Sequence, residues 1–164
     1  RRELAATGML RSAAMAGNDE EVILAATAVL TDAKVAPELE NEARYYRAKS
    51  LVKVNQMAHA VADWQSLAQD TRNAYGAEAK YLLAQYLFDA GKTAEAEKEV
   101  LNYLEVSTPH AYWLARSFVL LSDIYAKLDR KLEARQYLLS LKQNYQADDD
   151  IAGMIESRLE NLSE

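Results

Sequence analysis

The chain has 164 residues, of which half are hydrophobic and none is cysteine, and its formal net charge at pH 7 is −6. This length and apolar content fit one compact domain or a short repeat array and exclude a disordered tail, while the lack of cysteine excludes disulfides and thiolate metal sites. The acidic balance argues against nucleic acid as a partner, and no apolar run approaches the ~20 residues that span a bilayer, so we expect no direct membrane insertion.

Apolar residues recur at helical spacing along the whole chain, and no segment alternates with period two, so we expect helices and no strands. The many alanines and the small numbers of glycine and proline favour helix as well. In chain order, the predicted helices cover residues 3–16, 19–31, 38–54, 57–70, 77–90, 93–106, 110–128, 131–144 and 149–162.

Residues typical of turns separate these segments. Gly17, Gly76 and Gly91 supply a permissive backbone at predicted breaks, and Pro37 and Pro109 suit a first helical turn. The sequence therefore predicts short connections between antiparallel helices.

The chain also repeats itself at long range. Val22, Ala60, Ala96 and Ala134 occupy matching places and are 38, 36 and 38 residues apart. We interpret residues 1–164 as a single repeat domain. Its four predicted units and its capping helix cover residues 3–36, 37–75, 76–109, 110–147 and 148–164.

The last segment has the pattern of a helix that covers the end of a repeat array. Asp148 is expected to cap it, because a carboxylate accepts hydrogen bonds from the first free N–H groups. Apolar residues such as Ile151 and Ile155 recur at helical spacing, whereas Arg158 is expected to face water.

The repeated pattern resembles the tetratricopeptide repeat, or TPR, a family whose unit is a pair of antiparallel helices. The resemblance rests on a small residue at position 8, a large one at 11, a turn residue at 15 and alanine at 20. In the third unit these are Ala84, Leu87, Gly91 and Ala96, and in the other units, in chain order, they are Leu10, Ala13, Gly17 and Val22; Ala48, Leu51, Asn55 and Ala60; and Ser122, Tyr125, Asp129 and Ala134. The resemblance implies an all-α fold, a right-handed α-solenoid of about four TPR-like hairpins with a C-terminal capping helix.

In that family the first helix of each unit lines a concave groove that binds partner peptides. Carried over to this chain, the resemblance implies an exposed, partly aromatic groove, with no clamp for a C-terminal carboxylate. Its partner-binding residues would be Tyr45, Lys49, Tyr81, Gln85, Phe88, Arg116 and Asp123.

The function that follows is a non-enzymatic scaffold for a protein or peptide partner. We expect the chain to be part of a longer repeat protein, since it begins Arg1-Arg2 with no initiator methionine. The alternatives are an accessory or oligomerisation domain of a larger enzyme or regulator, and a self-associating module. Similar arrays occur in bacterial cell-envelope proteins, so the resemblance suggests the envelope or periplasm, although no residue fixes the location or the partner.

Two histidines are the main candidates for chemistry. His59 precedes Asp63 by four residues, which places both on one helical face, but two residues do not make a metal site. His110 has no serine or cysteine nucleophile at a plausible spacing. We therefore expect no catalytic residue, no metal and no cofactor.

Overall fold

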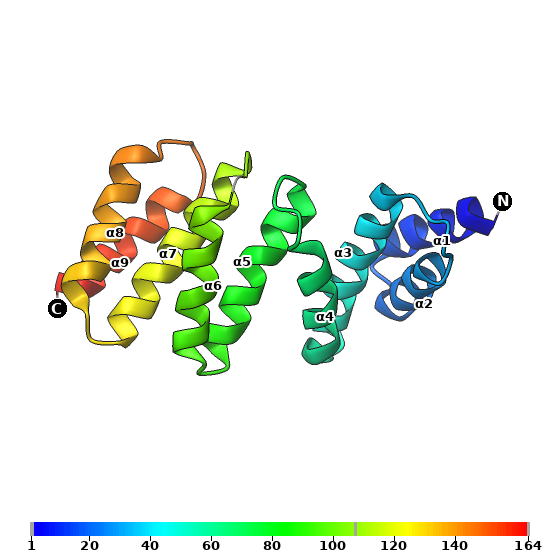
Figure 1. The fold of residues 1–164 in the computed structure, drawn as a ribbon, viewed down its shortest axis with the longest axis horizontal. Helices are drawn as coiled ribbons and strands as arrows, with labels where there is room; N and C mark the ends of the chain where they lie inside the picture. The colour runs from blue at the N-terminus through cyan, green and yellow to red at the C-terminus, as the bar shows by residue number, and fades with distance from the viewer. Residues whose placement is uncertain (1, 107, 164) are drawn as a thin grey trace. The chain divides into compact units, whose positions relative to one another are not determined.

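The computed structural model describes residues 2–106 and 108–163, and for residues 2–4 the backbone alone. Residues 1, 107 and 164, which the predicted repeat domain includes, lie outside this description. Over the described residues the chain forms nine helices and no strand, which confirms the expected all-α fold (Figure 1). The helices are α1 (Arg2–Ala16), α2 (Asp19–Leu30), α3 (Pro37–Lys53), α4 (Met57–Leu67), α5 (Ala74–Asp89), α6 (Thr93–Glu105), α7 (Ala111–Lys127), α8 (Lys131–Asn144) and α9 (Ile151–Ser163).

The chain divides into two compact units, residues 1–70 and 71–164. In the first unit, α2 packs against both α1 and α3, and α3 packs against α4. Its core is made largely of alanine and valine, with Leu10, Val22 and Val29 among the fully buried side chains. These small residues let the helices approach closely.

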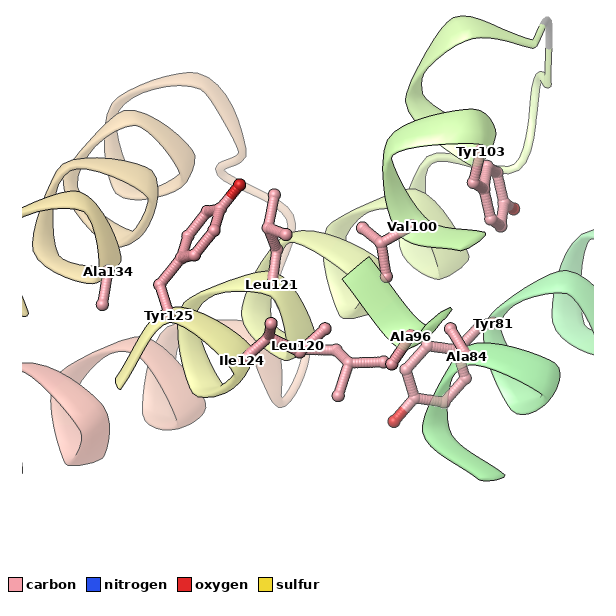
Figure 2. Packing of buried hydrophobic residues seen from close by; sticks show 10 residues of the cluster. All are labelled: Tyr81, Ala84, Ala96, Val100, Tyr103, Leu120, Leu121, Ile124, Tyr125 and Ala134. Carbon is pink, nitrogen blue, oxygen red and sulfur yellow. The ribbon is translucent and has the colours of Figure 1, made fainter. Parts of the chain in front are cut away.

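In the second unit, α7 is the central helix and packs against α5, α6, α8 and α9. Helix α6 contacts both α5 and α7, and α8 contacts both α7 and α9. The unit therefore has two layers, with α5, α7 and α9 in one and α6 and α8 in the other. Figure 2 shows part of its core, where Leu120, Leu121 and Ile124 of α7 lie among residues of α5, α6 and α8.

Every helical hairpin turns through one residue with a left-handed backbone. The φ angles are 70° at Gly17, 61° at Asn55, 79° at Gly91 and 59° at Asp129. Glycine adopts this conformation without steric cost, and Asn and Asp tolerate it better than other residues do. These four residues are the predicted position 15 of each unit, so the register of the repeat is visible in the backbone itself.

The hydrogen bonds around these turns are also the same each time. At the third turn, the N–H of Gly91 donates to Phe88 O at 3.0 Å and the N–H of Lys92 donates to Leu87 O at 2.9 Å. The other three turns have the equivalent pair of bonds. This Schellman arrangement satisfies carbonyls that a helix end would otherwise leave without a partner.

The predicted small positions are buried at the helix contacts. At positions 8 and 20 of the last three predicted repeat units, no residue is more than 1% exposed. These residues are Ala48, Ala84 and Ser122, and Ala60, Ala96 and Ala134.

Two further positions of the repeat, 19 residues apart in the chain, are in contact in three hairpins, although the chemistry of the pair changes. The pair is charged in two hairpins and aromatic in the last. The contacts are Arg44–Asp63 with N–O 3.6 Å, Lys80–Glu99 with N–O 2.7 Å, and Phe118–Tyr137 with ring centroids 6.0 Å apart.

The predicted ends of the two helices between the second and third repeat units are each wrong by about three residues. Helix α4 ends at Leu67 instead of 70, and α5 begins at Ala74 instead of 77. The cause is Asn73, whose side-chain oxygen accepts from the N–H of Tyr75 at 2.8 Å and so starts α5 early. Gly76, predicted to break the chain, lies buried in the first turn of α5.

Two further turn predictions need correction. Pro37 is the first residue of α3 as expected, but Pro109 lies before α7, which begins at Ala111. The side chain that caps α9 is Asp149, which accepts from the N–H of Ile151 at 2.9 Å, and not Asp148. The chain makes one more turn than predicted, in which the N–H of Asp149 donates to Ala147 O.

Candidate functional site

The seven predicted groove residues lie on three helices. Tyr45 and Lys49 are on α3 in the first unit, and the other five are on α5 and α7 in the second unit. Because α5 and α7 are packed neighbours, the structure brings these five into one region. We call this set the α5–α7 face; its members are Tyr81, Gln85, Phe88, Arg116 and Asp123.

Tyr81 and Arg116 form the centre of the α5–α7 face. The hydroxyl of Tyr81 accepts from Arg116 Nη2 at 3.0 Å and donates to Gln85 Oε1 at 2.9 Å. The guanidinium carbon of Arg116 lies 4.8 Å from the centroid of the Tyr81 ring. A cation held against an aromatic face is stabilised by the ring quadrupole, so helix α7 is fixed to α5 at this point.

The ring of Tyr81 is only 5% exposed and belongs to the hydrophobic core (Figure 2). The expectation that this ring would be presented on the surface is therefore wrong. Tyrosine has an apolar body and a polar tip, and here the body packs in the core while the hydroxyl joins the polar side chains of the face. Tyr81 supports the α5–α7 face and does not itself offer contact area.

Arg116 is held by aromatic residues of its own helix as well. Its Nη1 donates to the hydroxyl of Tyr112 at 2.9 Å, and its guanidinium lies within 6 Å of the ring of Trp113. Desolvation lowers the pKa of Arg116, but the bonds to Tyr112 and Tyr81 outweigh it and the pKa is raised above its usual value. The hydroxyl of Tyr112 in turn donates to Asp150 Oδ2 at 3.1 Å, just before α9.

The remaining members are also engaged. Gln85 Nε2 donates to Asp89 Oδ1 at 2.8 Å, and half-buried Phe88 packs against the core. Asp123 accepts two bonds from Arg158 of α9, from Nε at 2.8 Å and from Nη2 at 3.1 Å. The polar side chains of the face are therefore each held by hydrogen bonds to a neighbouring residue.

Several residues of this region escaped the sequence prediction. Arg158 was expected to face water, but it is half-buried and holds Asp123. Tyr112 and Trp113 surround Arg116. They precede it by four and three residues, and this helical spacing could have predicted the contact. The contact with Arg158 had no local signal, because it joins residues 35 apart.

The α3 pair in the first unit has a similar but smaller arrangement. Lys49 is exposed, and its Nζ lies 4.9 Å from the ring centroid of half-buried Tyr45. One turn earlier, Glu42 accepts two bonds from Arg11 of α1, at 2.8 and 2.9 Å. The hydrogen bond from Arg11 lowers the pKa of Glu42. An aromatic ring beside a cation is thus common to the predicted groove positions of both units.

The structure does not pair either candidate histidine with a second catalytic or metal-binding group among the described residues, and His59 is exposed. Asp63 is 1% exposed and is bound by Arg47, from Nε at 2.8 Å and from Nη2 at 2.6 Å, so His59 is not its partner. The Nε2 atom of His110 lies 2.9 Å from Arg72 O. No group of three potential metal ligands occurs among the described residues, and no helix there is long and apolar enough to cross a membrane.

The chain was compared with families, with curated proteins and with solved structures. No family model matches it, and no curated protein or solved structure matches it at a significant level. Its function must therefore be inferred from the contacts of its own residues.

Proposed function

We propose that this chain is a non-enzymatic scaffold that binds a protein or peptide partner, built as a right-handed α-solenoid of TPR-like hairpins. The support for the solenoid is internal. The same left-handed turn recurs at intervals of 38, 36 and 38 residues, and the same small residues lie at the helix contacts. Hairpins that each leave one apolar face uncovered bury it by stacking on the next hairpin.

The observation that carries the binding proposal is the α5–α7 face. Arg116 is held against three aromatic rings and bonded to two hydroxyls, so its cationic head has few conformations to lose on binding. Preorganised arginine and aromatic residues are the side chains that contribute most to protein interfaces. Half-buried Phe88 supplies apolar area beside them.

The chemistry of the face favours a peptide over other partners. A net charge of −6 makes nucleic acid a poor partner. An extended peptide with carboxylate and apolar side chains suits Arg116 and Phe88, and one with amide groups suits Gln85. The proposed function includes no catalytic role for His59 or His110.

The proposal is tested by selecting peptides from a random displayed library against the purified chain. Affinities of the selected peptides are then measured by fluorescence anisotropy for the parent chain and for Arg116→Ala and Phe88→Ala. We expect each substitution to weaken binding at least tenfold while the far-ultraviolet circular dichroism spectrum stays the same.

The matched control is Gln136→Ala, an exposed position on α8, in the other layer of the same unit. It should leave affinity unchanged. Selected peptides that bind Arg116→Ala and Phe88→Ala as tightly as the parent chain would refute the assignment of the α5–α7 face.

A second candidate function, as an accessory or oligomerisation domain of a larger enzyme or regulator, is favoured by a different region. Helices α1 and α2 leave large apolar side chains exposed, including Met9 and Leu24. Exposed apolar patches of this kind mark surfaces where another molecule packs.

A further inference from the structure

Helix α7 holds a half-buried cation, Arg116, that has no carboxylate partner among the described residues. Its hydrogen bonds go to the uncharged hydroxyls of Tyr112 and Tyr81, at 2.9 and 3.0 Å. The other half-buried basic side chains of the described chain each pair with a carboxylate: Arg44 and Arg47 with Asp63, Lys80 with Glu99, and Arg158 with Asp123. Desolvating a charge costs free energy unless an opposite charge takes the place of the water. Arg116 therefore lacks the counter-ion that the comparable residues have.

The two phenols hold the guanidinium of Arg116 without neutralising it. Tyr81 donates its hydroxyl proton to Gln85 Oε1 at 2.9 Å, and Tyr112 donates its own to Asp150 Oδ2 at 3.1 Å. Each phenol oxygen therefore presents only lone pairs to Arg116, and each fixes one end of the guanidinium. The Nε–H group of Arg116 has no acceptor among the described residues, so it remains available to an oxygen of a ligand.

We propose that Arg116 binds a single side-chain carboxylate of the partner peptide, so that the peptide supplies the counter-ion that the chain itself does not. This inference rests on the proposed peptide-binding function and names the group that the α5–α7 face recognises. A hydrogen bond between a guanidinium and a carboxylate is stronger than one between neutral groups. The rings of Tyr81, Tyr112 and Trp113 lie 4.8, 5.8 and 5.9 Å from the guanidinium carbon and limit the water that would weaken the bond.

The surroundings of Arg116 favour a ligand with one negative charge. Asp150 is linked to Arg116 through the hydroxyl of Tyr112, and Asp89 accepts from Gln85 on the same face. Both carboxylates would repel a second negative charge on the ligand. A phosphate carries close to two negative charges at pH 7. An isolated aspartate or glutamate of the peptide therefore suits this site better than a phosphorylated residue or a run of acidic residues.

The site is tested first with small probes that need no selected peptide. N-acetyl-glutamate α-amide, which has one side-chain carboxylate, and its neutral match N-acetyl-glutamine α-amide are titrated into the isotopically labelled chain at constant ionic strength. The Nε–H signals of the arginines are followed by NMR, and the signal of Arg116 is the one that Arg116→Lys removes. We expect this signal to shift saturably at millimolar concentrations of the acidic probe and to stay in place with the neutral probe.

Arg135 is the matched control within the same chain. It is exposed on α8 and has no partner among the described residues, so it reports general attraction of an anion to an arginine. Its signal should not saturate. N-acetyl-phosphoserine α-amide is the matched control for the ligand, and it should bind Arg116 more weakly than the glutamate probe does.

Peptides selected from the displayed library give the second arm. Each aspartate or glutamate of a selected peptide is replaced in turn by asparagine or glutamine, and one replacement should weaken binding by about tenfold or more, as loss of a charged hydrogen bond does. Amidation of the peptide's C-terminus should have no effect. In the variant Arg116→Gln, the decisive replacement should no longer weaken binding, because the carboxylate has already lost its partner.

The outcomes separate this inference from the proposed function. An Arg116 signal that responds alike to the acidic and neutral probes, or no more than that of Arg135, would overturn the carboxylate site. Tighter binding of the phosphoserine probe would overturn it too. Selected peptides that need Phe88 but tolerate loss of every side-chain carboxylate would overturn it and leave the proposed function intact. A saturable response to the acidic probe in a chain that selects no peptide would support the site and refute the peptide-binding function.

Discussion

Two hairpins, α3–α4 and α7–α8, place side chains of opposite chemistry at equivalent helix contacts. In the first, Arg47 and Arg44 surround buried Asp63. In the second, the place of Arg47 is taken by fully buried Leu121, and an aromatic pair replaces Arg44 and Asp63. The backbone turn has the same conformation in both hairpins, and small buried residues lie at the helix contacts of both.

The difference shows that the backbone register is set by turns and small residues, while the pairs between them are free to vary as long as they complement one another. The charged hairpin has the stricter requirement. Arg47 also donates to Thr27 of α2, at 3.2 Å, so it connects three helices. The hydrogen bond that Arg47 donates to Asp63 is the main cause that raises the pKa of Arg47. Each charge depends on the other for its place in the core.

The largest expected effect comes from breaking the charged pair. Asp63→Leu removes the carboxylate and leaves Arg47 without its partner, and losing one member of a buried pair costs about 3 kcal/mol even where the arginine keeps some access to water. Urea denaturation followed by circular dichroism should show this loss in the free energy of unfolding.

The double variant Asp63→Leu/Arg47→Met converts the charged hairpin toward the apolar chemistry of the other one. It should recover at least half of the loss, because apolar residues of similar volume replace buried ion pairs at little cost. If Asp63→Leu alone were as stable as the parent chain, the pair would have no role in holding the hairpin.

The next largest effect concerns the small position that the hairpins share. Ala84 is 1% exposed at a helix contact, so Ala84→Trp should cost about 2 kcal/mol or more through overpacking. Exposed Lys98→Trp on α6 is the control and should change the thermal midpoint little. Glu97 of the same helix would not serve as a control, because it is half-buried and pairs with Arg130 at 3.5 Å. Equal midpoints for both variants would refute the register.

The same substitution at the left-handed turn residue should change stability equally in the α3–α4 and α7–α8 hairpins. Asn55→Ala and Asp129→Ala each place alanine at a φ near +60°, which costs about 1 kcal/mol. Asn55→Gly and Asp129→Gly should avoid that cost. Chemical denaturation of the four variants checks this, and a loss in one hairpin without the other would show that the two turns are not equivalent.

The smallest effect is a pH dependence specific to the aromatic hairpin. Desolvation, followed by the carboxylate of Glu97, raises the pKa of Tyr125 to about 12. A raised pKa means that the folded state favours the protonated phenol, so this contribution to stability is present below pH 10 and is lost between pH 10 and 12. Tyr125→Phe should remove one late-titrating tyrosine from the absorbance titration near 295 nm. An unchanged titration curve would contradict it.

The sequence predicted the helices and turns well because glycine, asparagine and small residues act locally. Gly17, Asn55 and Gly91 mark turns through their own backbone preferences. The errors arose where long-range contacts decide. Tyr81 was expected on the surface, but its ring packs in a core shared with α6 and α7, and Arg116, 35 residues further along the chain, bonds its hydroxyl.

The binding proposal distinguishes the two helices of each hairpin, so a map of the contact surface tests it most directly. A peptide selected from the library would be titrated into the isotopically labelled chain, and amide chemical shifts followed by two-dimensional NMR. We predict that the largest changes lie on α5 and α7, around Gln85 and Arg116. Changes confined to α2, α4, α6 and α8 would contradict the proposal.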